Sequence, residues 1–173
     1  LCAGGHTAEL LALLEHMNLE RYSPRTYIVA STDRMGPQKA RDFEAHKHAS
    51  STSNEAAKIC VIPRSREVGQ SYLTSIWTTL VALWVAFSIV YREAPQLVLV
   101  NGPGTCIPIC LAARVIGVVR RTRIVYTESI ARVTSLSLSG KILYHMRLAD
   151  AFFVQWTDLQ RRFPRSTCCG RLF

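Results

Sequence analysis

The sequence predicts an α/β domain built on a doubly wound parallel sheet. Short apolar runs, typical of buried strands, alternate along the chain with helical patterns. Two glycine turns, residues 4–7 and 101–105, each lie between an apolar run and a helical run. The length of 173 residues suits one domain with its own core and leaves no room for an equal second domain.

The first elements form one unit around the first glycine turn. The turn precedes any complete strand, so we expect upstream sequence and a first strand that ends near Cys2. Residues 7–17 carry a broad stripe of leucine and alanine, which predicts a helix that Thr7 can cap. Residues 26–30 are apolar and β-branched and predict a strand, and a polar helix over 37–48 follows.

The middle of the chain alternates loops with two more strands. Residues 49–54 are small and polar and predict a flexible loop, and a short apolar strand over 58–62 follows. A charged loop over 63–67 leads into a long uncharged window, residues 68–91. Residues 96–100 are continuously apolar, which is typical of a central parallel strand that is covered on both faces.

The last elements continue the same alternation. They are a helix over 108–117, a strand over 123–127, a helix over 138–148, a strand over 151–155 and a short helix over 157–162. The helix over 138–148 begins near Ser137 or Ser139. In such a sheet, ligands bind at the carboxyl ends of the strands, where both glycine turns fall.

Positive charge gathers in the last third of the chain. Residues 114–173 hold eleven Lys and Arg against three acidic residues, out of a net charge of +9. Such a region favours an anionic partner, namely a diphosphate, an anionic membrane surface, nucleic acid or an acidic protein; the alternative is a solvated face. We expect no nucleic acid, because the arginines are not interleaved with stacking aromatic residues and no nucleic-acid-binding motif appears.

The six cysteines have no spacing typical of a zinc site or of a disulfide framework. We therefore expect reduced, mostly buried thiols in a cytosol-facing domain. No metal site is predicted.

Three predicted strand ends carry groups that suit phosphates and sugars. The first glycine turn can cradle a diphosphate, because glycine lets the backbone approach closely and the next helix points unpaired N–H groups at the ligand. The turn over 101–105 can bring backbone close to a sugar. Glu128 can accept hydrogen bonds from sugar hydroxyls or orient His6. Alternatively, each turn is only tight backbone, and Glu128 only caps or begins a helix.

Six islands of sequence carry a resemblance to a known family over nearly the whole chain. They are Gly4-Gly5-His6-Thr7, Tyr22–Arg25, Ile62–Val68, Asn101–Cys106, Glu128–Val133 and Ser137–Lys141. The chain resembles the membrane-anchoring, acceptor-binding subunits of the eukaryotic UDP-N-acetylglucosamine transferase of dolichol-linked oligosaccharide synthesis, the asparagine-linked glycosylation 14 family. It is also similar to the amino-terminal, acceptor-side domain of MurG-type bacterial glycosyltransferases.

The resemblance implies one Rossmann-like half of a GT-B glycosyltransferase. A cytosolic catalytic subunit would bind UDP-N-acetylglucosamine, and this chain would bind the lipid-diphosphate sugar acceptor at the cytosolic face of the endoplasmic reticulum membrane. The implied reaction adds the second N-acetylglucosamine to GlcNAc-diphosphodolichol with inversion, and without metal or cofactor. We expect the chain to be inactive alone.

His6 is the candidate base for the acceptor hydroxyl, with Glu128 in support, because imidazole titrates near neutral pH. Alternatively, His6 only hydrogen-bonds the loop or the diphosphate. Arg64 and Arg66 can pair with the diphosphate or with lipid headgroups, or can be solvated. The predicted substrate-binding residues are Gly4, Gly5, Thr7, Arg64, Arg66, Asn101, Gly102, Pro103, Gly104, Thr105, Glu128 and Ser129.

The uncharged window predicts a membrane-associated helix over about 71–91. Its bulky side, which can enter a membrane interface, carries Ile76, Trp77, Leu80, Leu83, Trp84, Phe87 and Tyr91. The opposite, small side can lie against the protein body and carries Ser75, Thr78, Thr79, Ala82 and Ala86. Residues 76–91 span about 24 Å as a helix against ~30 Å of hydrocarbon, which favours lying in the interface over spanning. A buried core helix is the alternative.

Residues 1–163 are expected to form the acceptor-binding domain and residues 164–173 a tail. In the similar family this tail inserts into the catalytic partner, so the predicted partner-binding residues are Gly170, Arg171, Leu172 and Phe173; a frayed tail is the alternative. Two other functions stay open. One is a self-sufficient nucleotide-sugar-dependent glycosyltransferase, disfavoured by the lack of a G-x-G-x-x-G motif, a P-loop and a second domain. The other is a membrane scaffold with a vestigial site.

Overall fold

Every strand pair in the structure is parallel, as the alternation of strands and helices predicts. The computed structural model describes residues 5–48, 57–64, 72–102 and 104–170. Within them, one sheet pairs β1 (Thr26–Ala30) with β2 (Lys58–Ile62). The other has the order β3 (Leu97–Asn101), β4 (Arg123–Thr127), β5 (Ala151–Val154) and β6 (Thr167–Cys168). The predicted sheet is therefore present as two parallel parts.

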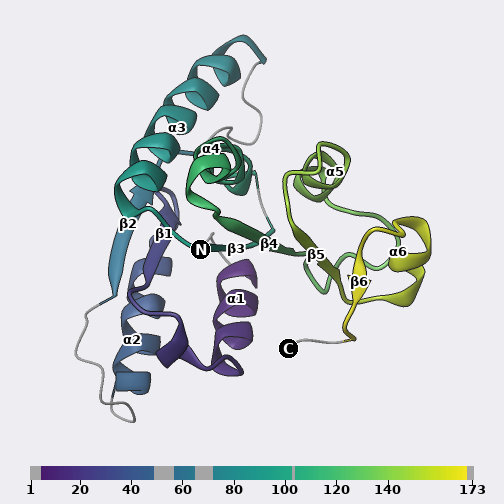
Figure 1. Cartoon of the computed structure of the whole chain (residues 1–173), viewed down its shortest axis with the longest axis horizontal. Coiled ribbons are helices and arrows are strands. Elements are labelled where there is room, and N and C mark those ends of the chain that lie inside the picture. The colour runs from purple at the N-terminus through teal and green to yellow at the C-terminus, as the bar shows by residue number, and fades with distance from the viewer. Residues whose placement is uncertain (1–4, 49–56, 65–71, 103, 171–173) are drawn as a thin grey trace.

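Helices cover both faces of the strands, which makes the architecture doubly wound. Figure 1 shows α1 (Gly5–Glu15) and α2 (Gly36–His48) below the row of strands and α3 (Tyr72–Glu93) and α4 (Cys106–Arg120) above it. Two shorter helices, α5 (Leu138–His145) and α6 (Thr157–Arg162), lie beside β5 and β6 (Figure 1). A 3₁₀ turn over Leu19–Arg21 leads from α1 toward β1. The predicted fold class is confirmed.

The main core lies between the larger sheet and the helices α3, α4 and α5. Tyr126 and Ile124 of β4 are fully buried there, as the apolar pattern of a central strand requires. The small side chains Ala82 and Ala86 of α3 are also fully buried, so this helix approaches the protein body closely. Four aromatic rings pack in series from β4 toward the end of the chain: Tyr126, Phe152, Tyr144 and Phe163.

The strands over 26–30, 58–62 and 123–127 match the prediction, whereas three helices end elsewhere. The first of them, α1, ends at Glu15 and not at residue 17. The helix predicted to stop at Gly117 continues to Arg120, because Gly117 O accepts the N–H of Arg121 at 2.7 Å. The helix predicted to reach Leu148 stops at His145, because Arg147 turns left-handed, at φ 53°. The left-handed residues at these ends, the cap residue Arg121 and Arg147 directly after the cap residue Met146, are arginines, so no glycine in the sequence marks either end.

The start of α1 also differs from the prediction. The helix begins at Gly5, so Thr7 lies within its first turn and does not cap it. The Thr7 side chain is buried, and its hydroxyl donates to Asp33 Oδ2 at 3.2 Å. Asp33 also accepts the N–H groups of Met35 and Gly36 at the start of α2. Thr7 thus ties α1 to the loop after β1. The expected strand end at Cys2 and the loop over 49–54 lie outside the described residues.

The strand β6 was not predicted, and it adds residues to the sheet that the sequence analysis assigned to the tail. Thr167 and Cys168 pair with Phe153 and Val154 of β5. Arg165 fixes the approach to this strand, because its guanidinium lies 4.2 Å from the Tyr144 ring centroid and donates to Tyr144 O at 2.8 Å. The part of the chain that extends past the sheet therefore begins after residue 168.

Candidate functional site

Four side chains from three elements meet at the carboxyl edge of the larger sheet. His6 and Glu9 lie one turn apart on α1, Asn101 is the last residue of β3, and Ser129 follows β4. Glu9 Oε1 accepts the Ser129 hydroxyl at 2.8 Å, and Glu9 Oε2 accepts Asn101 Nδ2 at 3.0 Å. His6 Nδ1 lies 3.1 Å from Asn101 Oδ1 and 3.4 Å from Glu9 Oε2. We call these four residues the edge cluster.

The hydrogen bonds of the edge cluster select one tautomer of His6. The Asn101 amide donates through Nδ2 to the Glu9 carboxylate, so its oxygen faces the imidazole. Both neighbours of His6 Nδ1, the Asn101 oxygen and the Glu9 carboxylate, can only accept, so the Nδ1 proton is the one retained in the neutral ring. The lone pair then lies on Nε2. With 34% of its side chain exposed, His6 can present Nε2 to a ligand as a base.

Gly102, directly after β3, allows the imidazole to sit in this position. Its φ of +82° is a conformation that favours glycine, and an added Cβ would lie 2.5 Å from His6 Nδ1. Gly104 has open space around it, and Thr105 is buried before α4. In the second glycine turn, Asn101 therefore belongs to the edge cluster, and Gly102 leaves the space that the His6 imidazole occupies. Pro103 lies outside the described residues, as does Gly4 of the first turn.

Glu128 does not orient His6, contrary to one expectation from the sequence. Its side chain is 1% exposed, and its Oε2 accepts both the N–H and the hydroxyl of Ser137 at 3.0 Å. Oε1 accepts the N–H of Ser129 at 3.1 Å. Ser137 in turn caps α5 by accepting the N–H of Gly140. Glu128 therefore holds Ser137 at the start of α5 without itself capping or beginning a helix, and Glu9 is the carboxylate beside His6.

Sequence reasoning missed Glu9, although a signal for it exists. Residues three apart on a helix lie on the same face, so a helix that begins at Gly5 places Glu9 beside His6. The prediction started this helix at Thr7 and treated His6 as part of a turn, which hid that spacing.

Of the two arginines in the charged loop, only Arg64 is among the described residues. Arg64 follows β2, which pairs with β1 in the smaller sheet. Arg66 lies outside the described residues. Among the described residues no hydrogen bond or ion pair joins Arg64 to the edge cluster, and the predicted role of Arg64 toward a diphosphate stays a prediction.

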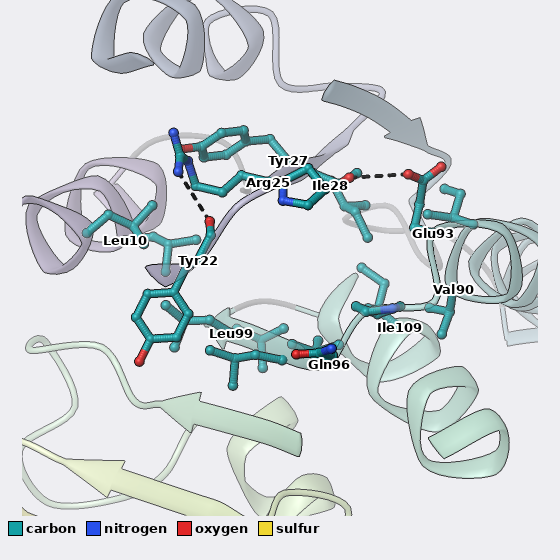
Figure 2. Close-up of a pocket in the computed structure, with 18 of the residues that line it drawn as sticks. Leu10, Tyr22, Arg25, Tyr27, Ile28, Val90, Glu93, Gln96, Leu99 and Ile109 are labelled. Atoms are coloured by element: carbon teal, nitrogen blue, oxygen red, sulfur yellow. Dashed lines mark hydrogen bonds between the residues drawn. The ribbon is translucent and has the colours of Figure 1, made fainter. Parts of the chain in front are cut away.

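A cavity of about 500 Å³ lies between β1 and β3, beside the edge cluster. Figure 2 shows apolar side chains from both sheets and from α3 and α4 turned into it, among them Ile28, Val90, Leu99 and Ile109. Arg25, at its margin, forms a two-bond ion pair with Glu44, at 2.8 and 2.6 Å. The charge of Arg25 is thus neutralised within the protein. The cavity suits apolar groups better than a diphosphate.

The bulky side of α3 is largely exposed. The exposed residues, which we call the α3 apolar face, are Ile76, Trp77, Leu80, Val81, Trp84 and Tyr91. Phe87 was expected there but is half-buried and packs against the core, and Leu83 is half-buried too. On the small side, Ala82 and Ala86 are buried as expected, whereas Thr79 is exposed. The alternative that α3 is a buried core helix therefore does not hold, because one side of α3 is exposed.

By length and composition, the described residues contain one helix that could cross a membrane. Residues 76–93 have a mean hydropathy of 1.2, and 22% of them are buried. Near the end of this helix, the guanidinium of Arg120, the last residue of α4, lies 5.0 Å from the Tyr91 ring centroid and donates to Tyr91 O. Trp and Tyr on an exposed apolar face are typical of a helix at a membrane interface.

The predicted partner-binding residues are described only in part. Gly170 is exposed and has a φ of +73°. Arg171, Leu172 and Phe173 lie outside the described residues. Within the described ranges, no group of three or more His, Cys, Asp and Glu side chains could hold a metal ion.

Comparison with known proteins places this geometry in a family. The family described as "Oligosaccharide biosynthesis protein Alg14 like" matches residues 1–172. The chain is 46% identical to the human "UDP-N-acetylglucosamine transferase subunit ALG14" over 174 residues, which cover 98% of this chain and 79% of that protein. It is 41% identical to the Schizosaccharomyces pombe protein of the same name, with 97% of this chain and 79% of that one covered.

A solved structure agrees with the fold. The crystal structure of Acinetobacter baumannii MurG matches with a TM-score of 0.61 at 17% sequence identity, covering 88% of this chain and 39% of the MurG chain. At 17% identity the match shows similarity of fold alone. Together with the relatives, it confirms the resemblance drawn from the six islands: the chain belongs to the Alg14-like family of oligosaccharide biosynthesis proteins.

Proposed function

We propose that this chain is the acceptor-binding subunit of an inverting UDP-N-acetylglucosamine transferase that extends a lipid-diphosphate sugar. The observation that carries the proposal is the edge cluster, which presents His6 Nε2 as a base at the carboxyl edge of a parallel sheet. The human and Schizosaccharomyces pombe relatives are each named as a UDP-N-acetylglucosamine transferase subunit. The acceptor is GlcNAc-diphosphodolichol, to which the second N-acetylglucosamine is added.

In this reaction the acceptor sugar hydroxyl attacks the anomeric carbon of UDP-N-acetylglucosamine. The new bond joins the hydroxyl oxygen to that carbon, the bond to the UDP oxygen breaks, and its electron pair leaves with UDP. His6 Nε2 takes the hydroxyl proton. A cytosolic partner binds the nucleotide sugar and closes over this chain, in keeping with relatives that are named as transferase subunits.

The test is a transfer assay with the purified complex, UDP-N-acetylglucosamine and a GlcNAc-diphosphate lipid. We expect turnover only with both subunits present, and a loss of about 10²- to 10⁴-fold in kcat for His6→Ala, the range of general base catalysis. Turnover by this chain alone would favour the self-sufficient enzyme. Full turnover of the His6→Ala complex would exclude His6 as the base, and a complex without turnover would favour the scaffold.

We also propose that the α3 apolar face holds the complex at the cytosolic surface of the endoplasmic reticulum membrane. Trp77 and Trp84 are the most exposed residues of this face, at 71% and 76%. Liposome flotation of the Trp77→Glu/Trp84→Glu variant tests this, and we expect binding to fall at least about tenfold, because two charges replace the exposed apolar side chains that would enter the membrane interface. Leu138→Glu is the matched control, since Leu138 is also 71% exposed but lies on α5. Equal flotation of the unmodified complex, the Trp77→Glu/Trp84→Glu variant and the Leu138→Glu control would refute the proposal.

A further inference from the structure

We infer that Glu9 is a positioning residue for His6, and that it acts by holding the imidazole in the tautomer that a base requires. The inference rests on the proposed function, because it assigns Glu9 a part in the same proton transfer.

Glu9 is the only member of the edge cluster that contacts the other three. Its two carboxylate oxygens join α1 to the ends of two neighbouring strands, through Asn101 of β3 and Ser129 after β4. The Ser129 hydroxyl accepts the N–H of Ala131 at 3.3 Å, so its proton is left for Glu9 Oε1. With 14% of its side chain exposed, Glu9 is held in one place by these contacts.

The direction of each hydrogen bond follows from the carboxylate. Because a carboxylate only accepts, Asn101 must turn its amide nitrogen toward Glu9 and its oxygen toward His6 Nδ1. The Glu9 carboxylate, 3.4 Å from the same nitrogen, favours a proton there as well. Free imidazole has no such constraint. Glu9 therefore favours the Nδ1–H tautomer through two contacts, its own contact with His6 Nδ1 and its hydrogen bond to Asn101. In this tautomer Nε2 is free of a proton and can receive one.

A second effect follows during the reaction. When Nε2 takes the acceptor proton, the ring becomes a cation, and the Glu9 carboxylate beside Nδ1 stabilises that charge. The other buried carboxylate of this region, Glu128, is turned to Ser137 and Ser129 and does not face the imidazole. Glu9 is thus the acidic group in contact with His6 among the described residues.

The kinetic test uses the complex with its catalytic partner and the same transfer assay. We expect Glu9→Gln, which keeps the shape but removes the charge, to lower kcat at least about tenfold, part of the range of general base catalysis. The KM for the lipid acceptor should change less than about threefold, because His6 stays in place. Glu15→Gln is the matched control, since Glu15 is exposed on the same helix, and it should leave kcat unchanged.

A double variant separates positioning from a general structural role. If Glu9 acts through His6, adding Glu9→Gln to His6→Ala should cause no further loss of kcat. If Glu9 has a general structural role, Glu9→Gln should lower kcat by the same factor in the unmodified complex and in the His6→Ala complex. A spectroscopic readout is independent of turnover. Nitrogen-15 NMR of labelled histidines in the complex should show His6 as the Nδ1–H tautomer, and Glu9→Gln should reduce that population.

The outcomes distinguish a failure of the role of Glu9 from a failure of the proposed function. An unchanged kcat and tautomer in Glu9→Gln, with His6→Ala impaired, would overturn the role of Glu9 and leave the proposed function standing. Additive losses in the double variant would also overturn it. Full activity of His6→Ala would instead remove the proposed base itself. If the Glu9→Gln complex does not assemble, Glu9→Asp replaces it, because it draws the carboxylate back by one methylene and should lower kcat similarly.

Discussion

Gly102 provides the sharpest test of the edge cluster, because one methyl group is enough to displace His6. In Gly102→Ala the new Cβ would lie 2.5 Å from His6 Nδ1, against about 3.4 Å for an ordinary contact. The imidazole must therefore move by roughly 1 Å, and a misplacement of that size can cost about 10²-fold in rate. We expect kcat of the complex to fall by about that factor.

The same substitution has a small and separable effect on stability. A φ of +82° costs an L residue about 1–2 kcal/mol. Losing the bond between His6 and Asn101 adds about 0.5–1.5 kcal/mol, and the lower entropy of the unfolded chain returns about 0.4–1 kcal/mol. The net loss of roughly 0.5–3 kcal/mol corresponds to a drop in Tm of several degrees. Thermal unfolding of the complex measures it.

Gly104→Ala is the matched control two residues away, because Gly104 has open space around it and no positive φ. Its kcat and Tm should stay close to those of the unmodified complex. If Gly102→Ala lost stability as expected but kept kcat within about threefold, the placement of His6 beside the second glycine turn would have no catalytic meaning. The reasoning about the edge cluster would then be refuted.

Glu128, Asp150 and the last residues of the chain can be tested in the same way. Glu128→Gln should lower the free energy of unfolding by about 1–3 kcal/mol, measured by urea denaturation, because an amide cannot accept every bond that the buried carboxylate accepts from Ser137 and its neighbours. For Asp150, burial raises the pKa, but the backbone N–H of β4 and Arg114 outweigh it and hold the pKa below 3.8. Its contribution should therefore be present above pH 3.8 and disappear as the pH falls through the lowered pKa, so Asp150→Asn should destabilise at pH 6 and have a smaller effect as the pH falls below 3.8. Deleting residues 170–173 should abolish pull-down of the catalytic partner while leaving Tm unchanged, since the last strand of the sheet ends at residue 168; undiminished pull-down would contradict the role of the tail.

The apolar runs determined the strands, because a parallel strand that is covered on both faces needs a continuous run of apolar, β-branched residues. Three of the five predicted strands match to the residue. β6 escaped prediction since it is two residues long and is held by contacts made elsewhere, through Arg165 and Tyr144. Helix ends escaped where arginine, rather than glycine, takes the left-handed position.

For the site, the sequence alone determined the chemistry that is available: a histidine, two glycine turns and small polar residues after strands. It also determined the family, because the matching islands are local motifs. Which carboxylate serves His6 was decided only by the tertiary structure. Glu9 and Ser129 are 120 residues apart, and whether Glu128 faces a ligand or a helix start depends on how β4 and α5 pack. Local pattern specifies which groups follow each strand, but only packing sets the direction of a side chain.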